Sequence, residues 1–592
     1  MSIDPKRLRC ARDQARETLL GARNAQGHWS GELSSSALAT ATAINALRIV
    51  QRETGTDHQS LIDGGLYWLA KNANDDGGWG DTVKSLSNIS TTTLCWAMFE
   101  EGDKFGDVKK RANTWLEKAA GGTDPGKLAP AIIRRYGKDR TFSVPILTHC
   151  ALAGKVGWER VLQLPFELAA FPQGWFAALR LPVVSYALPA LIAIGQARHA
   201  HRPTLNPITR LLRGTTRKKT LSVLQKIQPP NGGFLEATPL TSFVTMSLAG
   251  SGMADHPVVK KGVGFLNQSV RPDGSWPIDT NLATWVTTLS INALGDSVRE
   301  LLTENERDKI RDWLMAQQYR EVHPYTNAAP GGWAWTDLPG GVPDADDTPG
   351  ALIALKHLGG DCREAAELGV GWLLDLQNRD GGMPTFCRGW TNLPFDRSSP
   401  DLTAHAMRAW QAWRGDLSGL HARIDNAYTR AARYLANSDG PHGWAPLWFG
   451  NQHAPGEINW TYGTAKVAMA LNEPAQLAQP GGAMRQRGAR NCLLHLQRED
   501  GAWGGCENGP ASIEETALAL EALSGMGDEE GEDGADVQAA RDQGTNWLLE
   551  EVESVAWKNP SPIGFYFAKL WYYEKLYPMI FATGALERLD TR

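Results

Sequence analysis

Residues 365–383 read AAELGVGWLLDLQNRDGGM and carry the pattern that decides the fold. Apolar side chains recur at helical spacing from Ala365 to Leu376. The NRDGG that follows cannot continue a helix cheaply, because glycine favours helix ends and turns. The stretch therefore predicts a helix that ends in a glycine-rich turn, closed by the apolar residue Met383.

The same turn recurs along the whole chain, with an aromatic residue in most copies. Copies in the second half lie roughly 40 to 60 residues apart, which leaves room for two helices in each repeat. The residues that close the turns are Trp29, Trp79, Phe234, Trp276, Trp333, Met383, Trp444 and Trp503. The copies thin out between Trp79 and Phe234, which predicts two barrels rather than one continuous array.

A threonine and a run of small apolar residues follow several of these turns. Threonine is a common N-cap, and small apolar side chains suit a helix packed on several sides. We therefore expect inner helices to begin at Thr348, Thr403, Thr464 and Thr516. Helices so apolar favour closure over an open solenoid, and no stretch alternates like a strand. The sequence predicts an all-α fold of α/α barrels that enclose an apolar cavity.

Composition excludes several classes of protein. Acidic residues outnumber basic ones by five, which disfavours a nucleic-acid partner. The seven cysteines are scattered without CxxC pairs, which argues against a disulfide framework or a structural zinc site. The N-terminus is polar and shows no signal-peptide core, and the longest charge-free apolar run, 181–195, is too short to span a bilayer.

Residues 168–235 contain nine Lys or Arg and no acidic residue. An apolar segment followed by a basic one could lie in an anionic membrane surface. A buried helix followed by a solvated basic loop would produce the same pattern. Both interpretations remain open from the residues alone.

The sharpest local signal is Asp344-Ala345-Asp346-Asp347, in the sequence GGVPDADDTPG. Three carboxylates within four residues cannot all ionise comfortably when partly buried, so one should keep its proton. That proton could serve as an acid catalyst. An exposed acidic turn that caps a helix and a magnesium site are the alternatives.

Alignment of the predicted helix starts brings three distant polar residues together. Asp346 and Tyr462 each lie two residues before an expected start, and His405 lies two after one. All three should therefore meet at one end of a barrel. Asp401, four residues before His405 on the same helix face, should hold the imidazole and favour its charged form.

Tryptophan is unusually frequent, with 23 residues, and most of them should pack between helices. Trp333 and Trp335, however, lie close to the acidic motif. Aromatic faces beside a proton donor in a closed apolar cavity attract a carbocation without quenching it.

Together these motifs resemble the class II terpene cyclases, specifically the squalene–hopene cyclases. The glycine–aromatic turns are similar to that family's QW repeats, and DADDT is similar to its DxDD(T) motif, which implies that Asp346 is the proton donor. PDLTAH and NWTYGT resemble the segments whose His and Tyr support the acid. The resemblance implies a catalytic set of Asp344, Asp346, Asp347, Asp401, His405 and Tyr462.

The resemblance also implies a set of aromatic residues around the substrate. Segments such as PGGWAW, LATWVTT and DGGMPTF are similar to family segments that carry cavity aromatics. The expected cavity residues are Tyr186, Trp285, Trp333, Trp335, Phe386, Phe565, Tyr572 and Tyr573.

The implied architecture is two α/α barrels attached monotopically to the cytoplasmic face of a membrane. Residues 1–20 plus 270–592 would form the catalytic barrel, and residues 21–269 the second barrel with the membrane contact. The reaction would need no metal and no other cofactor. The partners would be a lipophilic polyprene and the membrane surface, with a homodimer as a further possibility.

The implied activity is protonation-initiated cyclisation of squalene, or of a similar linear polyprene, to a polycyclic triterpene. A cyclase of another polyprenyl or meroterpenoid substrate and a non-catalytic α/α binding module are the alternatives. A glycosidase would need two carboxylates in a polar open cleft, which the apolar inner helices disfavour.

Overall fold

A computed structural model describes residues 3–100, 102, 104–178, 186–386, 394–472, 481–526, 532–565 and 569–590. The predicted all-α fold is confirmed, because helices dominate and the strands are only two or three residues long. The helices of the first half are α1 (Pro5–Gly21), α2 (Ala37–Thr54), α3 (Gln59–Lys71), α4 (Ile89–Met98), α5 (Gly106–Ala120), α6 (Pro125–Tyr136), α7 (Ser143–Leu152), α8 (Gln173–Ala178), α9 (Leu188–His201), α10 (Pro207–Ile227), α11 (Thr238–Leu248) and α12 (Pro257–Ser269). Those of the second half are α13 (Ala283–Leu294), α14 (Val298–Leu301), α15 (Glu304–Ala316), α16 (Asp347–Leu358), α17 (Arg363–Leu376), α18 (Pro400–Arg414), α19 (His421–Ala436), α20 (Trp460–Leu471), α22 (Gly482–Leu496), α23 (Ile513–Ser524), α24 (Glu532–Glu553) and α25 (Tyr577–Asp590).

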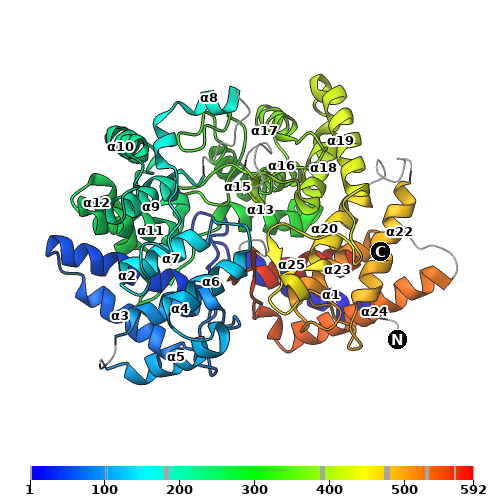
Figure 1. Ribbon diagram of the computed structural model, residues 1–592. Helices are drawn as coiled ribbons and strands as arrows, with labels where there is room; N and C mark the ends of the chain where they lie inside the picture. Colours follow the sequence, from blue (N-terminus) through cyan, green and yellow to red (C-terminus); the bar gives the residue numbers. More distant parts are fainter. Residues whose placement is uncertain are drawn as a thin grey trace.

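The inner helices close into two rings that lie side by side (Figure 1). In the first ring α2 packs on α4, α4 on α7, α7 on α9, α9 on α11, and α11 returns to α2. In the second ring the order is α13, α16, α18, α20, α23 and α25, and α25 returns to α13. The preference for closed barrels over an open solenoid is thus confirmed.

Burial separates inner from outer helices. All residues of α4 from Ser90 to Met98 are buried, as are all but two of α16. The outer helix α15 buries only Ile310 and Leu314, and its first turn carries the acidic residues Glu304 and Glu306. The outer helices therefore face solvent on one side, as their charge predicts.

The glycine-rich turns join each outer helix to the next inner one, and the turn at Trp503 shows how. The Trp503 indole Nε1 donates to the Leu493 carbonyl at 2.7 Å, and its backbone N–H donates to Thr516 Oγ1 at 2.9 Å. Gln497 Nε2 donates to the carbonyls of Gly501 and Ala540 at 2.8 and 2.9 Å. The turn therefore binds two outer helices and one inner helix at once.

The expectation that these threonines are N-caps is wrong. Thr516 lies in the first turn of α23, whose N-cap is Ser512, and it uses its hydroxyl to bind the turn of the repeat. Thr348, Thr403 and Thr464 bind the backbone N–H of Trp333, Met383 and Trp444 in the same way. The repeated threonine is selected by this tertiary hydrogen bond and not by helix initiation.

Two further hydrogen bonds between a turn and a threonine hydroxyl join distant parts of the chain. The backbone N–H of Trp29 donates to Thr287 of α13, and that of Trp276 donates to Thr40 of α2. Helix α1 packs on α25 and α24, so the N-terminal helix belongs to the second ring. The chain thus begins in one ring, completes the other and then returns.

Short strands, which the sequence pattern did not reveal, border the space between the rings. Strand β1 (Ser35–Ser36) pairs with β2 (Trp276–Pro277), and β3 (Phe449–Gly450), β4 (Ile563–Phe565) and β5 (Leu570–Tyr572) form a small antiparallel sheet. Segments of this length are too short for the alternation that identifies a strand.

Candidate active site

The acidic motif begins inner helix α16. One carboxylate oxygen of Asp344 accepts the backbone N–H groups of Asp346 and Asp347, each at 2.8 Å, and this holds the turn before the helix. Burial raises the pKa of Asp344 to about 7. Burial and the neighbouring Asp344 also raise the pKa of Asp347, whose Oδ1 has no hydrogen-bond partner within the described residues. This buried pair therefore retains a proton.

Asp346 pairs with His405 of inner helix α18. The imidazole Nδ1 lies 2.7 Å from Asp346 Oδ1, and the two side chains are only 12% and 17% exposed. Asp346 and His405 therefore lie together, as the alignment of helix starts predicted. Burial lowers the pKa of His405, and the hydrogen bond to Asp346 opposes this effect. The effect of burial is the larger one, so the expectation that the surroundings of His405 favour the charged imidazole is wrong.

Asp401 does not hold the imidazole, contrary to the expectation from helix spacing. Its carboxylate accepts the Ser399 hydroxyl and the backbone N–H of Leu447, and burial raises its pKa to about 6. It ties the start of α18 to the loop before β3. The i, i+4 spacing brought Asp401 to the correct helix face, but backbone and hydroxyl donors closer to it bind the carboxylate.

Tyr462 lies behind Phe449 and outside the cavity lining. Its ring stacks on Phe449, with the ring centroids 4.4 Å apart, and Phe449 in turn lines the cavity. Burial, and then the charges of Asp346 and Asp401, raise the pKa of its phenol well above the usual value. Tyr462 is therefore a neutral hydroxyl in the neighbourhood of the Asp346–His405 pair.

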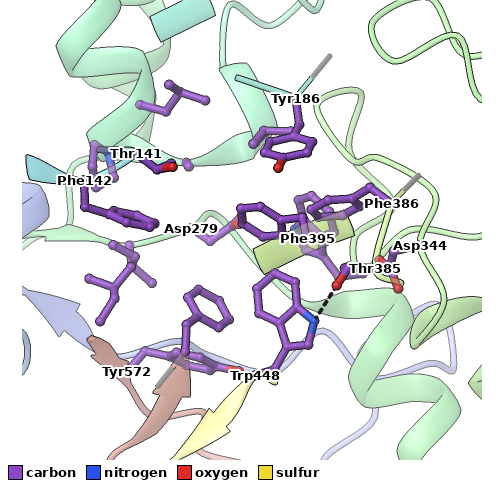
Figure 2. A pocket seen from close by; sticks show the side chains of 18 of the residues that line it. Thr141, Phe142, Tyr186, Asp279, Asp344, Thr385, Phe386, Phe395, Trp448 and Tyr572 are labelled. Atoms are coloured by element: carbon purple, nitrogen blue, oxygen red, sulfur yellow. Dashed lines mark hydrogen bonds between the residues drawn. The ribbon is translucent and has the colours of Figure 1, made fainter. Parts of the chain in front are cut away.

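A cavity of about 310 Å³ opens in front of the acidic motif (Figure 2). Asp344, Asp346 and Asp347 line it at one end. Most of the remaining wall is apolar, and its aromatic members are Tyr136, Phe142, Tyr186, Phe243, Trp285, Trp335, Phe386, Phe395, Trp448, Phe449, Phe565, Tyr572 and Tyr577. The predicted cavity residues Tyr186, Trp285, Trp335, Phe386, Phe565 and Tyr572 all lie on this wall.

Two of the predicted cavity aromatics lie elsewhere. Trp333 closes a repeat turn, where its Nε1 donates to the Leu314 carbonyl, so its indole is buried between helices outside the cavity lining. Tyr573 follows Tyr572 at the end of β5 and lies outside the lining, with the Lys84 ammonium 5.3 Å from its ring. Alternation along an extended chain explains why Tyr572 reaches the cavity and Tyr573 does not.

Hydrogen bonds hold several of the cavity rings in place. The Trp285 indole donates to the Tyr577 hydroxyl at 3.0 Å, which lies 3.1 Å from the Tyr572 hydroxyl. The Trp448 indole donates to Thr385 Oγ1 at 3.2 Å, the dashed line of Figure 2. These bonds fix ring orientation while leaving the apolar faces toward the cavity.

Seven aromatic residues of the described lining were not predicted from the sequence: Tyr136, Phe142, Phe243, Phe395, Trp448, Phe449 and Tyr577. Trp448 and Phe449 follow the turn at Trp444 directly, so an aromatic pair after a repeat turn was the available signal. Phe142 precedes α7 and Phe395 lies in a short 3-10 helix (Pro394–Asp396), without any repeat or motif around them.

Within the described ranges, no cluster of three His, Cys, Asp or Glu side chains could hold a metal ion. No helix there combines the length and apolarity needed to cross a bilayer. The geometry instead offers a carboxyl paired with an imidazole, open to a largely apolar cavity whose lining includes many aromatic rings. Such a site can deliver a proton to an apolar ligand and stabilise the cation that results.

Comparison with known proteins agrees with this geometry. The squalene-hopene cyclase C-terminal domain matches residues 281–591, and the N-terminal domain of the same family matches residues 13–118. The probable squalene–hopene cyclase of Sinorhizobium fredii is 23% identical over 670 residues, which cover 98% of this chain and 96% of that protein.

Other relatives are longer. The enfumafungin synthase of Hormonema carpetanum is 26% identical over 351 residues, which cover 53% of this chain and 25% of that protein. A terpene cyclase-glycosyl transferase fusion protein of Humicola fuscoatra is 27% identical over 315 residues, which cover 45% of this chain and 23% of that protein. The chain thus spans about a quarter of the length of these two relatives.

Among solved structures, the ent-copalyl diphosphate synthase of Streptomyces platensis has the same fold. The TM-score is 0.56 at 18% identity, and the likeness covers 99% of both chains. The match to the C-terminal domain alone spans more than half of the sequence, so the chain belongs to the squalene-hopene cyclase family.

Proposed function

We propose that the protein is a class II terpene cyclase in which Asp346 protonates the terminal alkene of a linear polyprene. One observation carries this proposal: the Asp346–His405 pair, joined at 2.7 Å, opens into an apolar cavity lined by many aromatic rings. The matched family and the names of its relatives support the same class of reaction.

In the proposed reaction an O–H bond of Asp346 breaks as a C–H bond forms at the less substituted carbon of the terminal alkene. The neighbouring carbon becomes a tertiary cation, and each further alkene supplies the electron pair for a new C–C bond. Loss of a proton, or capture of water, ends the sequence. His405 stabilises the carboxylate left on Asp346 and so makes the proton easier to release.

The aromatic wall supports the cations. Trp285 lies 6.3 Å from the His405 ring, and Phe449 stacks near Trp285, so π faces stand close to where the first charge would develop. A ring face attracts a cation but offers no lone pair that would trap it. The largely apolar lining of the cavity offers few groups that could trap the intermediates.

The expected substrate is squalene or a similar linear polyprene, and the expected product is a polycyclic triterpene of the hopanoid kind. Squalene–hopene cyclases among the relatives support this choice. Another polyprenyl or meroterpenoid substrate would suit the same acid and cavity. A non-catalytic binding module has less support, because it would have no use for a buried acid paired with an imidazole.

A membrane contact forms the second part of the proposal. Apolar side chains protrude from α8, from the start of α10 and from the segment before it, where Trp175 is 60% exposed, Leu205 100% and Ile208 78%. The basic residues Arg217 and Lys218 are exposed on the same helix, α10. An amphipathic surface of this kind supports monotopic attachment, which we propose is to the cytoplasmic leaflet.

Product analysis of the detergent-solubilised protein incubated with squalene and other linear polyprenes tests the proposal. The wild type should form cyclic products, and Asp346→Asn, which is nearly isosteric but has no acidic proton, should form none. Cyclic products from a folded Asp346→Asn variant would overturn the assignment of the acid. Asp337→Asn, at an exposed carboxylate outside the cavity lining, is the matched control.

A further inference from the structure

The cavity wall carries a carboxyl group that the cyclisation mechanism does not use. Asp279 follows β2 and lies between Ile278 and Leu282, which also line the cavity (Figure 2). Among the described lining residues it is the one acid outside the DADD motif. The residue is half-buried, and it forms part of the cavity lining.

Glu236 lies behind Asp279 and is better supplied with hydrogen-bond donors. Its carboxylate accepts Asn231 Nδ2 and the backbone N–H of Gly340, both at 2.7 Å, and Thr280 Oγ1 at 3.2 Å. Burial raises the pKa of Glu236, and these three donors oppose that effect by stabilising its charged form. Of the two carboxyl groups, Glu236 is therefore the one equipped to hold the negative charge.

Asp279 has fewer partners. The backbone N–H of Thr280 donates to its Oδ1 at 2.7 Å, and Trp335 lies beside the same carboxyl. Burial, and then the charge of Glu236, raise the pKa of Asp279 well above its usual value. This shift favours the protonated form of Asp279, which presents both a hydrogen-bond donor and an acceptor to the cavity.

A pure hydrocarbon cannot satisfy this group. When a hydrocarbon chain covers a polar group and expels its water, the group loses hydrogen bonds that correspond to roughly 5- to 150-fold in affinity. An oxygen atom on the ligand would restore those bonds. Thr141, another polar residue of the wall, is labelled in the same view of Figure 2 as Asp279 and contributes a hydroxyl group to the lining.

We propose that Asp279 is a specificity-determining residue that hydrogen-bonds an oxygen atom of the substrate, so that the preferred substrate is an oxygen-bearing linear polyprene. The oxygen would be a hydroxyl, carbonyl or ether group, at a position other than the alkene that Asp346 protonates. This inference rests on the proposed cyclase function and narrows its substrate class. It requires no change in the acid or in the aromatic wall.

Binding measurements separate this inference from the question of turnover. The probes are squalene and a linear polyprenol of equal carbon number, and the readout is tryptophan fluorescence, since Trp285, Trp335 and Trp448 line the cavity. Affinities are measured in Asp346→Asn, which should bind without reacting, and in Asp346→Asn combined with Asp279→Leu, Asp279→Asn or Asp337→Asn. The kcat/KM of the single variants at Asp279 is measured with both substrates.

The expected result is a preference of about tenfold or more for the polyprenol, lost in Asp279→Leu. Asp279→Asn retains hydrogen-bonding groups and should keep part of the preference, and Asp337→Asn should keep all of it. Equal affinity for both probes, or an equal loss of both in Asp279→Leu, would overturn the inference. If Asp279→Leu does not fold, a preference for the polyprenol that Asp279→Asn leaves unchanged from the wild-type value would do the same. Failure of the proposed cyclase function looks different: the probes bind, but the wild type forms no cyclic product from either.

Discussion

Replacing His405 by phenylalanine tests how strongly the imidazole supports the acid. The substitution keeps an aromatic ring near Trp285 but removes the 2.7 Å bond to Asp346. A hydrogen bond to a charged group contributes about 1.5–3 kcal/mol. Each 1.36 kcal/mol changes a rate about tenfold, so kcat should fall about 10- to 150-fold. KM should change little, because the lost bond stabilises the carboxylate that forms during proton transfer.

Initial rates of cyclic product formation in detergent, with thermal melting followed by circular dichroism, provide the assay. His405→Gln should recover part of the rate, since its amide N–H can still donate to Asp346. His357→Phe is the matched control, because that histidine pairs with Asp296 at the opposite end of α16. Turnover of His405→Phe within twofold of the wild type, at an unchanged melting temperature, would refute the role assigned to the pair.

Three further predictions concern metal, membrane and pH. Addition of EDTA should leave turnover unchanged, because the DADD carboxylates are proposed to hold a proton; loss of activity that magnesium restores would assign them as ligands. Replacing Arg210, Arg217, Lys218 and Lys219 by Gln should weaken sedimentation with anionic vesicles at low salt more than at high salt; identical sedimentation would leave α10 as a solvated helix. Burial raises the pKa of Glu514 to about 8, so between about pH 5 and 8 the folded protein binds more protons than the unfolded chain and stability falls as the pH rises. The melting temperature of Glu514→Gln should therefore fall less than that of the wild type between these pH values. An equal fall would show that Glu514 does not contribute to the pH dependence of stability.

The parts of the fold that repeat were predictable. The turn from Gln377 to Met383 recurs with the same spacing to its helix, so the helix pairs and their closure could be read from the pattern. Asp346 and His405 were predictable for a related reason, since both lie near equivalent helix starts. Helix periodicity identifies helices and their buried faces, and the positions of these two residues follow mainly from that information.

The remaining site residues depend on tertiary contacts that periodicity does not encode. Asp401 shares a helix face with His405, yet the nearby Ser399 hydroxyl and Leu447 N–H bind its carboxylate. Trp448 and Tyr572 reach the cavity from short strands and loops, where no period exists. The basic stretch shows the same limit, because Arg213, one of its members, is buried and pairs with Glu167 at 3.1 Å.

Each ring is held by a turn that lies in the other half of the sequence, and this limits how the protein can be divided. Trp29 lies near the N-terminus but completes the second ring through Thr287, and Trp276 lies just before that ring yet completes the first through Thr40. Cutting the chain after α12 would therefore leave each fragment without a turn that its own ring requires. Contacts of such long sequence separation also make folding slow and cooperative. Neither half is an autonomous module, and exchange of segments between relatives must move α1 together with the C-terminal ring.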